Sequence, residues 1–182
     1  GPADGASNRR IQRRSRDPVG LTGVDKKVRQ KTLRMLSNGV YVLTSRSDDR
    51  YGAATVTWVS QVSFKPPLIM AAVRRESNVF KCLAASRTAV LHIVGDEQED
   101  IARRFFYPTR AESGTINGEP FAEGSTTAPV LACLPAHVEC RVERIVDAEG
   151  DHAMVILGVV DAECGERVRP LTVADAPWED GG

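Results

Sequence analysis

The chain has 182 residues, 42% of them hydrophobic, and its formal net charge is zero. A chain of this length buries roughly 70% of its unfolded surface, so we expect a folded domain with a real core. The zero net charge gives no overall attraction to nucleic acid or acidic lipid. No run approaches the roughly 20 apolar residues of a membrane-spanning helix.

The cysteines and the first residues bear on the cellular compartment. Four cysteines occur, and no two form a C-x-x-C pair. The chain therefore lacks the cysteine framework of small secreted domains. The first ten residues are polar and contain no apolar signal region. We expect a cytoplasmic protein that neither enters a membrane nor binds nucleic acid.

Residues 1–23 form a predicted flexible arm with a basic run, Arg9, Arg10, Arg13, Arg14 and Arg16. Such a run is usually solvated or packed on a partner subunit, and it can also bind nucleic acid or acidic lipid. No aromatic side chains interleave it, which argues against nucleic acid.

The first elements after the arm are a helix and a strand. Residues 24–37 are predicted to be helical, because Val28, Leu33 and Leu36 share one face. Asn38-Gly39 then favours a helix end. Residues 40–45 are β-branched and apolar, which is typical of a strand.

From Tyr51 to Phe64 apolar and polar residues alternate, which predicts one long strand with a core-facing side. The more apolar side carries Val56, Trp58, Ser60, Val62 and Phe64. Pro66-Pro67 must end this strand, since proline donates no backbone hydrogen bond.

Further elements follow at short intervals. Residues 68–73 are a continuous apolar run and predict a buried strand. A short helix is expected over 78–86 and a strand over 89–94. Asp96 and Glu99 have the spacing of a capping box, which predicts a helix from there to Phe106.

The last third combines a long loop with a hairpin. Residues 107–128 are rich in Gly, Ser, Thr and Pro, as in a lid or binding loop. Residues 136–147 and 152–163 predict two strands around a turn at Glu149-Gly150. Together the elements predict an α+β, mainly β fold with a mainly antiparallel barrel and short helices. We assign residues 24–165 to this domain and 166–182 to a C-terminal tail.

Three segments contain candidate functional residues. Arg74-Arg75-Glu76-Ser77 precede a helix, and a helix start with arginines and a hydroxyl suits a phosphate monoester. The alternative is that Ser77 only caps the helix and the arginines are solvated.

The second segment is the polar side of the long strand, Thr55, Thr57, Gln61 and Ser63, beside Trp58. Short hydroxyl side chains let a planar ring approach the backbone. The alternative is an ordinary half-exposed strand.

The third segment is Gly150-Asp151-His152. A histidine beside a turn acts as a proton donor near neutral pH or lies beside a hydride-transfer site. The alternative is that these residues only form the turn, with Gly150 allowing a positive φ and Asp151 capping backbone groups with its side chain.

Other chemistries lack their motifs. The chain has no G-x-S-x-G, Walker, G-x-G-x-x-G or H-E-x-x-H sequence. His137 and Cys140 have the wrong spacing to share one face of a strand as metal ligands. We therefore expect no metal, and a nicotinamide would be bound without a Rossmann domain.

In this order the segments resemble the flavin reductase-like, FMN-binding split-barrel family over roughly residues 28–163. The resemblance rests on the ordered set 38–44, 52–57, 60–63, Pro66-Pro67, 75–78, 102–105, 150–152 and Gly158.

The resemblance implies an antiparallel split β-barrel of Greek-key type with short peripheral helices. It also implies a homodimer that binds FMN, with FAD as a possible substitute, and takes a hydride from NADH or NADPH. It implies that the ring lies along Thr55–Ser60, the phosphate near Arg75 and Ser77, and that His152 is the catalytic residue. The cofactor-binding residues predicted in this way are Thr55, Val56, Thr57, Trp58, Ser60, Arg75, Ser77, Asn78, Arg104 and Phe105.

The predicted function is an NAD(P)H:flavin oxidoreductase that supplies reduced flavin or electrons to a monooxygenase or another redox acceptor. One departure keeps an alternative open. Thr57-Trp58-Val59 stands where common reductases of the family carry Asn-Ser-Phe. The Trp-Val-Ser-Gln sequence is similar to that of relatives associated with flavodiiron or rubredoxin-type electron transfer. The alternative is a flavin-binding electron-transfer module without nicotinamide activity.

Overall fold

The computed structural model describes residues 23–178, and the predicted basic arm lies almost entirely outside them. The chain divides into two units, residues 1–35 with 181–182 and residues 36–180. The described part of the first unit is helix α1, Gly23–Leu33. It ends four residues earlier than predicted, and a backbone turn follows, in which Met35 N–H donates to Thr32 O at 3.0 Å.

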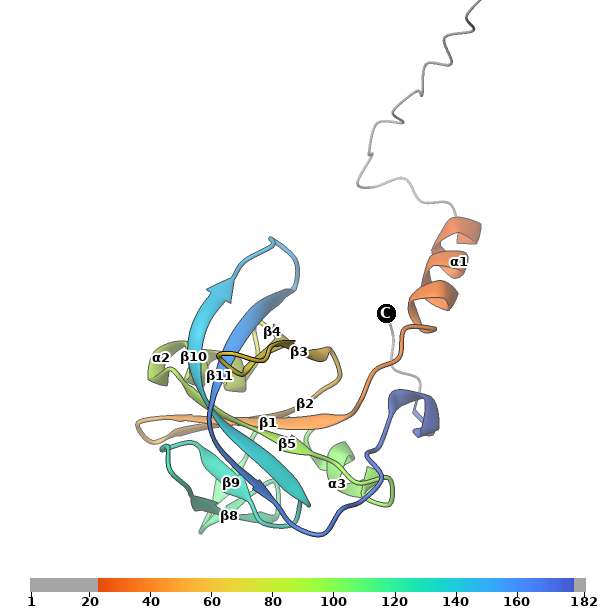
Figure 1. The fold of residues 1–182 in the computed structure, drawn as a ribbon. Helices are drawn as coiled ribbons and strands as arrows, with labels where there is room; N and C mark the ends of the chain where they lie inside the picture. The colour runs from red at the N-terminus through yellow and green to blue at the C-terminus, as the bar shows by residue number, and fades with distance from the viewer. Residues whose placement is uncertain (1–22, 179–182) are drawn as a thin grey trace, which may run out of the picture. The chain divides into compact units, whose positions relative to one another are not determined.

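The second unit is built on a seven-stranded sheet in the order β2-β1-β5-β10-β11-β4-β3. Every neighbouring pair in it is antiparallel, which confirms the predicted fold class (Figure 1). The strands are β1 Tyr41–Ser47, β2 Arg50–Val56, β3 Val59–Ser63, β4 Leu68–Arg74, β5 Thr88–Ile93, β10 Ala136–Val146 and β11 His152–Cys164.

A two-residue corner, Thr57 and Trp58, forces this sheet to curve. β2 and β3 are its opposite edges, and in a flat sheet of seven strands they would be about 29 Å apart. The chain from Val56 to Val59 spans at most about 11 Å. The sheet must therefore curl until its edges meet, although no ladder of hydrogen bonds joins β2 to β3 and the sheet stays open there.

The same corner corrects the prediction of one long strand over 51–64. In the corner Trp58 is 44% exposed, and beyond it Val62 is 50% and Phe64 88% exposed. The predicted core-facing side is therefore wrong past Val56. Alternation reports only that successive side chains point to opposite faces. It does not say which face of a bent edge strand meets the core.

The segment predicted as a long loop contains most of a second, four-stranded sheet. Its strands are β6 Ala111–Glu112, β7 Thr115–Ile116, β8 Glu119–Glu123 and β9 Pro129–Leu131. The turns between the first three strands use Gly114 and Gly118 at φ +80° and +83°, a conformation natural to glycine. Strands this short carry too few residues for an alternating pattern, which is why the sequence resembled a loop.

The loop before β9 is anchored by a buried carboxylate. Glu139 accepts hydrogen bonds from Ser125 N and Thr126 N, both at 2.9 Å. Burial alone would raise the pKa of Glu139, but these hydrogen bonds outweigh it and the pKa is lowered. The carboxylate thus ties the second sheet to β10.

Three short helical segments complete the fold: α2 Asn78–Ser86, α3 Glu99–Arg104 and the 3₁₀ turn Val173–Asp175. α2 matches its prediction and buries Val79, Cys82 and Leu83. The capping box predicted at Asp96 is wrong. The residue before α3 is Gln98, whose side-chain oxygen instead accepts from Gly95 N at 3.0 Å.

Two apolar clusters fill the unit. The first gathers residues of the large sheet and α2, including Leu43, Val73, Leu83 and Leu157. The second joins the ends of β1 and β5 to α3 and the small sheet. It includes Leu171, whose N–H donates to Val94 O at 2.8 Å, so a residue of the predicted C-terminal tail is part of a core. The domain boundaries themselves stay a prediction.

His92 on β5 joins the two sheets from inside. Its Nδ1 lies 2.9 Å from Val42 O, and its Nε2 lies 2.9 Å from Leu131 N–H. Since Leu131 N–H can only donate and Val42 O can only accept, the ring must be neutral, with the proton on Nδ1. Burial lowers the pKa of His92 to about 3.

This buried histidine predicts a pH dependence of stability. Between pH 6.5 and 3 the unfolded state binds the proton and the folded state does not, so the free energy of unfolding falls as pH falls through that window. Denaturant unfolding should show a loss of about 2 kcal/mol between pH 7 and 5 from this group.

The control is His92→Gln, which should flatten the pH dependence while lowering stability at pH 7. If that variant does not fold, the wild-type imidazole signals in NMR decide. A His92 resonance that titrates between pH 5 and 7 would contradict the assignment.

Candidate functional site

One rim of the barrel brings together the corner, the end of β4 and the start of β11. His152 pairs with Arg74 in the ladder between β11 and β4. Trp58 O accepts from Ala72 N at 2.9 Å, which holds the corner against β4. The Trp58 and His152 rings therefore meet, with centroids 4.7 Å apart and planes tilted by 51°.

His152 is held by its neighbour in sequence. Its Nδ1 lies 2.7 Å from Asp151 Oδ1, and this hydrogen bond lowers the pKa of Asp151 below its usual value. The ionised carboxylate accepts, so Nδ1 carries the proton and Nε2 is left to interact with a ligand. The side chain of His152 is 22% exposed, whereas that of Asp151 is 87% exposed.

Arg75 connects the end of β4 to the β10–β11 hairpin. The Arg75 guanidinium forms an ion pair with Asp147, and the Arg75 backbone N–H donates to Asp151 O at 3.2 Å. Its Nε is buried and has no partner among the residues that the structure describes. A buried guanidinium N–H without an acceptor costs free energy, and an anion at this position would remove that cost.

The start of α2 lies beside Arg75. The Ser77 hydroxyl accepts from Phe80 N at 3.2 Å and donates to Arg74 O at 2.6 Å, so Ser77 caps the helix. This agrees with the simpler of the two interpretations of Ser77. Within residues 23–178 the N–H groups of Asn78 and Val79 donate no hydrogen bond, and they lie at the positive end of the helix dipole. Val79 itself is buried against Gly52 of β2.

The fit between α2 and β2 requires a glycine. A Cβ placed on Gly52 would lie 2.4 Å from Val79 Cα, which is backbone and cannot rotate away. Overpacking of this kind costs about 1–3 kcal/mol. Gly52 thus lets the strand approach the helix start, and its position in a strand was the signal for a close backbone approach.

A second group of predicted residues lies along the outer edge of β2. Thr55 N–H donates to Phe105 O at 3.2 Å, and the Thr55 hydroxyl donates to Ala102 O at 2.6 Å. Arg104 forms an ion pair with Glu119 at 2.9 Å. Phe105 is 2% exposed and packs in the second cluster. The polar groups of this edge are therefore already engaged by α3.

The other predicted cofactor-binding residues lie in the core, on β3 and at the corner. Val56 is 9% exposed and belongs to the first cluster. Ser60 lies on β3 opposite Met70, and its hydroxyl donates to Gln61 O at 3.1 Å. Thr57 is at the corner beside Trp58. Contacts thus group Trp58, Arg75, Ser77, Asn78 and His152 at the rim, while Thr55, Arg104 and Phe105 form a separate group.

Sequence reasoning missed two residues of these surroundings. Asp147 holds Arg75, and the Thr109 hydroxyl bonds both backbone groups of Ala53, at 3.0 and 3.2 Å. Only the register of the hairpin could have placed Asp147 near Arg75. No local signal marks Thr109.

Two other kinds of feature are absent from residues 23–178. They contain no group of three or more His, Cys, Asp or Glu side chains placed to hold a metal ion. None of their helices is long and apolar enough to cross a membrane.

Known proteins similar to this chain include flavin reductases and diflavin flavoproteins. An NADH:FMN oxidoreductase of Rhodococcus qingshengii is 30% identical over 139 residues, which cover 76% of this chain and 71% of that protein. A flavin reductase (NADH) of Kitasatospora aureofaciens is 34% identical over 128 residues, 69% of this chain and 65% of its own length.

Among solved structures, BorF, the flavin reductase component of a bacterial two-component tryptophan halogenase, has the same fold. Its TM-score is 0.71 at 24% identity, with 86% of this chain and 96% of BorF covered. The family model for the flavin reductase like domain matches residues 33–176. The chain belongs to the flavin reductase like domain family.

Proposed function

We propose that this protein is an NAD(P)H-dependent flavin reductase that binds FMN at the rim formed by Trp58, Arg75, Ser77, Asn78 and His152. One observation carries the proposal. In this chain an exposed indole packs against a histidine that pairs with Arg74 at the end of β4, and the next residue, Arg75, has a buried guanidinium nitrogen without a partner among residues 23–178. A ring-stacking surface and an anion site adjoin, as a phosphorylated ring cofactor requires.

The phosphate end fits the start of α2. The Asn78 N–H at the helix start supplies a donor, and Arg75 supplies a permanent charge. Arg75 already holds Asp147, so a bound phosphate would share or displace that carboxylate. Because Asp147 is exposed, its ion pair with Arg75 is weak enough to open.

The ring end fits the corner. Trp58 is 44% exposed, so its indole presents a flat apolar surface beside the His152 ring. Thr57 lies beside it in the corner, and Ser60 follows on β3. The Thr55 hydroxyl and N–H are bonded to α3, so we place the ring toward Thr57–Ser60 and give Thr55, Arg104 and Phe105 a supporting role.

Bound FMN supplies the redox chemistry, since its ring accepts a hydride and passes electrons on. The protein needs to orient the ring and the nicotinamide and to exclude water between them. Asp151 fixes the His152 ring with Nε2 free, so that His152 Nε2 can accept a hydrogen bond from the nicotinamide carboxamide and position it.

The partner is proposed to be a monooxygenase or another acceptor of reduced flavin. The likeness to BorF supports this, since BorF is the reductase component of a two-component enzyme. We also propose a cytoplasmic location, where NADH and NADPH are available.

The reductase proposal predicts that NADH or NADPH bleaches the flavin absorbance of the FMN-loaded protein in stopped-flow mixing. His152→Gln should slow bleaching about ten- to a hundredfold with little change in FMN affinity, because it misplaces the nicotinamide. Glu149→Gln at the hairpin tip is the matched control and should leave the rate unchanged.

Protein that retains FMN but is not bleached by either nucleotide would refute the reductase and favour the electron-transfer module. Protein that binds no FMN would refute both.

The phosphate site predicts that Arg75→Ala combined with Ser77→Ala weakens FMN binding by about 2–4 kcal/mol, through lost charge-assisted hydrogen bonds. Fluorescence titration measures this. Riboflavin, which lacks the phosphate, should lose far less affinity. Asp147→Asn is the control, because it releases Arg75 and should keep or tighten FMN binding. Equal losses for FMN and riboflavin would place the phosphate elsewhere.

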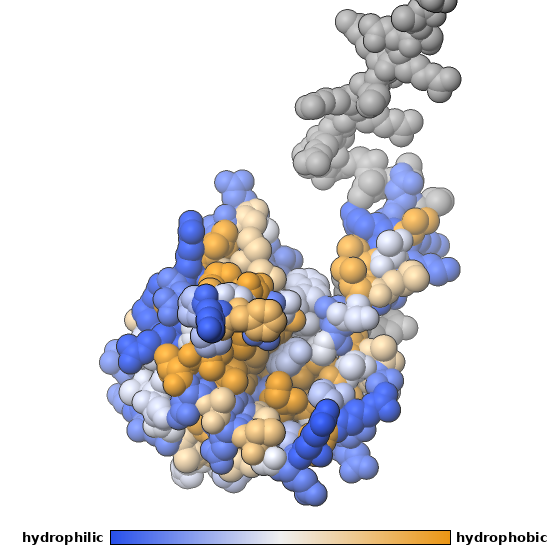
Figure 2. All heavy atoms as spheres, in the orientation of Figure 1, coloured by the Kyte–Doolittle hydropathy of each residue, from blue (hydrophilic) through white to orange (hydrophobic). Residues whose placement is uncertain are grey.

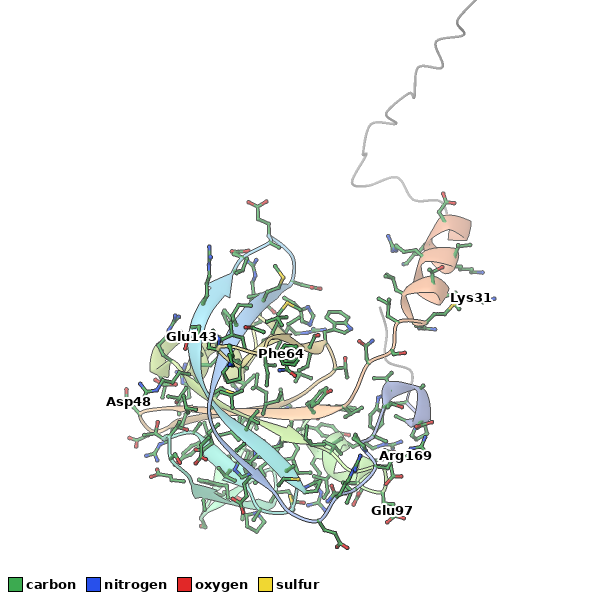
Figure 3. All side chains as sticks on the ribbon, viewed as in Figure 1. Lys31, Asp48, Phe64, Glu97, Glu143 and Arg169 are labelled. Atoms are coloured by element: carbon green, nitrogen blue, oxygen red, sulfur yellow. The ribbon has the colours of Figure 1, made fainter. Side chains whose placement is uncertain are left out.

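We further propose a homodimer that uses the side of the barrel carrying β3 and β11. Val62, Phe64 and Val160 are large apolar side chains exposed there, and Figure 2 shows apolar side chains gathered over this part of the unit. Figure 3 labels Phe64, which follows β3 at the edge of the large sheet. Soluble monomers rarely expose such patches without use.

The dimer proposal predicts a dimer mass in sedimentation equilibrium. Phe64→Glu should shift that mass toward the monomer, because it places a charge in an apolar contact. Lys65→Glu next to it is the control for charge alone. A wild-type monomer at micromolar concentration would contradict the assignment.

A further inference from the structure

A cavity of about 560 Å³ lies at the end of the barrel away from the proposed flavin site. It is lined by the end of β11, the start of β10, β9 with the residues after it, and the turn before α3. Glu163 in the cavity and His152 at the rim lie at opposite ends of β11, whose chain between them has an extended length of at most about 36 Å. Figure 3 shows Glu97, another lining residue, at the end of the unit opposite the hairpin tip.

The cavity has the size and the walls of a small-molecule site. Val130, Leu131, Leu134 and Val168 contribute apolar surface, and ligand sites of a few hundred Å³ are mostly apolar with a few polar groups. Gln98 fixes one wall, because its amide donates to Cys133 O at 2.7 Å and accepts from Gly95 N. These bonds indicate a preformed wall.

The carboxylates and basic groups that line the cavity directly are of one sign only. Its lining contains four carboxylates, Asp96, Glu97, Glu163 and Glu166, and no lysine or arginine. A cleft lined by one sign of charge concentrates ligands of the other sign. The phosphates of FMN and of nicotinamide nucleotides would be repelled, so this cavity is separate from the flavin site in chemistry as well as in position.

The most informative lining residue is His137. Its side chain is nine-tenths buried, and its Nε2 lies 4.0 Å from Glu163 Oε2. That distance is too long for a hydrogen bond, and among residues 23–178 no other group bonds either nitrogen of the ring. The neighbouring His92 has both nitrogens engaged and offers no alternative partner.

The gap between His137 Nε2 and Glu163 Oε2 fits a single donor with several protons. A carboxylate and an unprotonated imidazole nitrogen both accept hydrogen bonds. An ammonium nitrogen about 2.9 Å from each can bridge acceptors 4.0 Å apart, because that separation is less than twice the bond length. An alcohol hydroxyl has one proton and can donate to only one of them. A water molecule can donate to both, but it lacks the positive charge that the four lining carboxylates attract.

The surroundings favour an organic cation over a metal ion. Burial raises the pKa of the Cys133 thiol to about 12, so it stays neutral and does not offer a thiolate. Within the described part of the chain no cluster of three metal-ligating side chains occurs at this place.

We propose that this cavity binds a small primary ammonium ion with an apolar body, held between His137 and Glu163. The proposal is independent of the flavin reductase function, because none of its residues lies at the flavin rim. It assigns the protein a second ligand site at the opposite end of the same barrel.

The test uses 2-phenylethylamine as the probe, titrated into the FMN-loaded full chain by calorimetry at low salt. The matched probes are 2-phenylethanol, which is neutral, and 3-phenylpropanoate, which is anionic. We expect the ammonium to bind several-fold more tightly than the alcohol and the carboxylate not to bind. Two-dimensional NMR should show shifts at residues 95–98, 130–137 and 163–168.

Two variants test the contacts. Glu163→Gln should raise the Kd of the ammonium about two- to fivefold, as expected for an exposed charge. His137→Phe keeps a ring against His92 but removes the acceptor, and should raise the Kd about five- to tenfold. Glu149→Gln, at the other end of β11, is the control for loss of one negative charge and should leave the Kd unchanged.

Three outcomes would overturn the proposal: no binding of 2-phenylethylamine, equal binding of the three probes, or NMR shifts confined to residues outside the cavity. Unchanged binding in both cavity variants would also overturn it. A failure to bleach with nicotinamides would leave this result untouched, so the two functions are judged separately.

Discussion

Thr57 and Trp58 join two strands that are opposite edges of a seven-stranded sheet, and this short link governs the shape of the unit. The link is about 18 Å too short for a flat sheet, so the sheet must curl and its edges must meet. The bend removes Trp58 from the core and sets its indole against His152. The same closure brings the end of β4 and the α2 start to one rim. The proposed flavin site is therefore a consequence of how the barrel closes.

Buried polar groups then hold the parts of the barrel together. His92 links β1, β5 and β9 through both ring nitrogens, and Glu139 anchors the loop before β9. A buried polar group without partners is costly, so these residues fix one arrangement of the two sheets. They also shape the far end of the barrel, where His92 stacks on His137 at the cavity wall. The two ends differ in charge: the rim carries free donors and Arg75, and the cavity carries carboxylates.

At the rim, most polar groups are already in use, and the free ones indicate where a ligand fits. Ser77 and Thr55 engage their hydroxyls with the protein's own backbone. Arg75 Nε and the first N–H groups of α2 have no partner in the described residues. The distinction matters because a group with a satisfied hydrogen bond gains little from a ligand, while an unsatisfied buried group gains much. The family of the chain supplies a flavin as the natural candidate.

The sequence by itself determined the antiparallel, mainly β fold, the bounds of α2, the hairpin of β10 and β11, and the family resemblance, because each depends on local patterns of period, turns and caps. It also identified Arg75, Ser77 and His152 as candidates. Only the tertiary structure decided that Trp58 and Phe64 are exposed, that Asp147 holds Arg75, that residues 111–131 build a second sheet, and that His137 faces Glu163 across a cavity. These features depend on the curvature and register of strands distant in sequence, and local alternation carries no information about either.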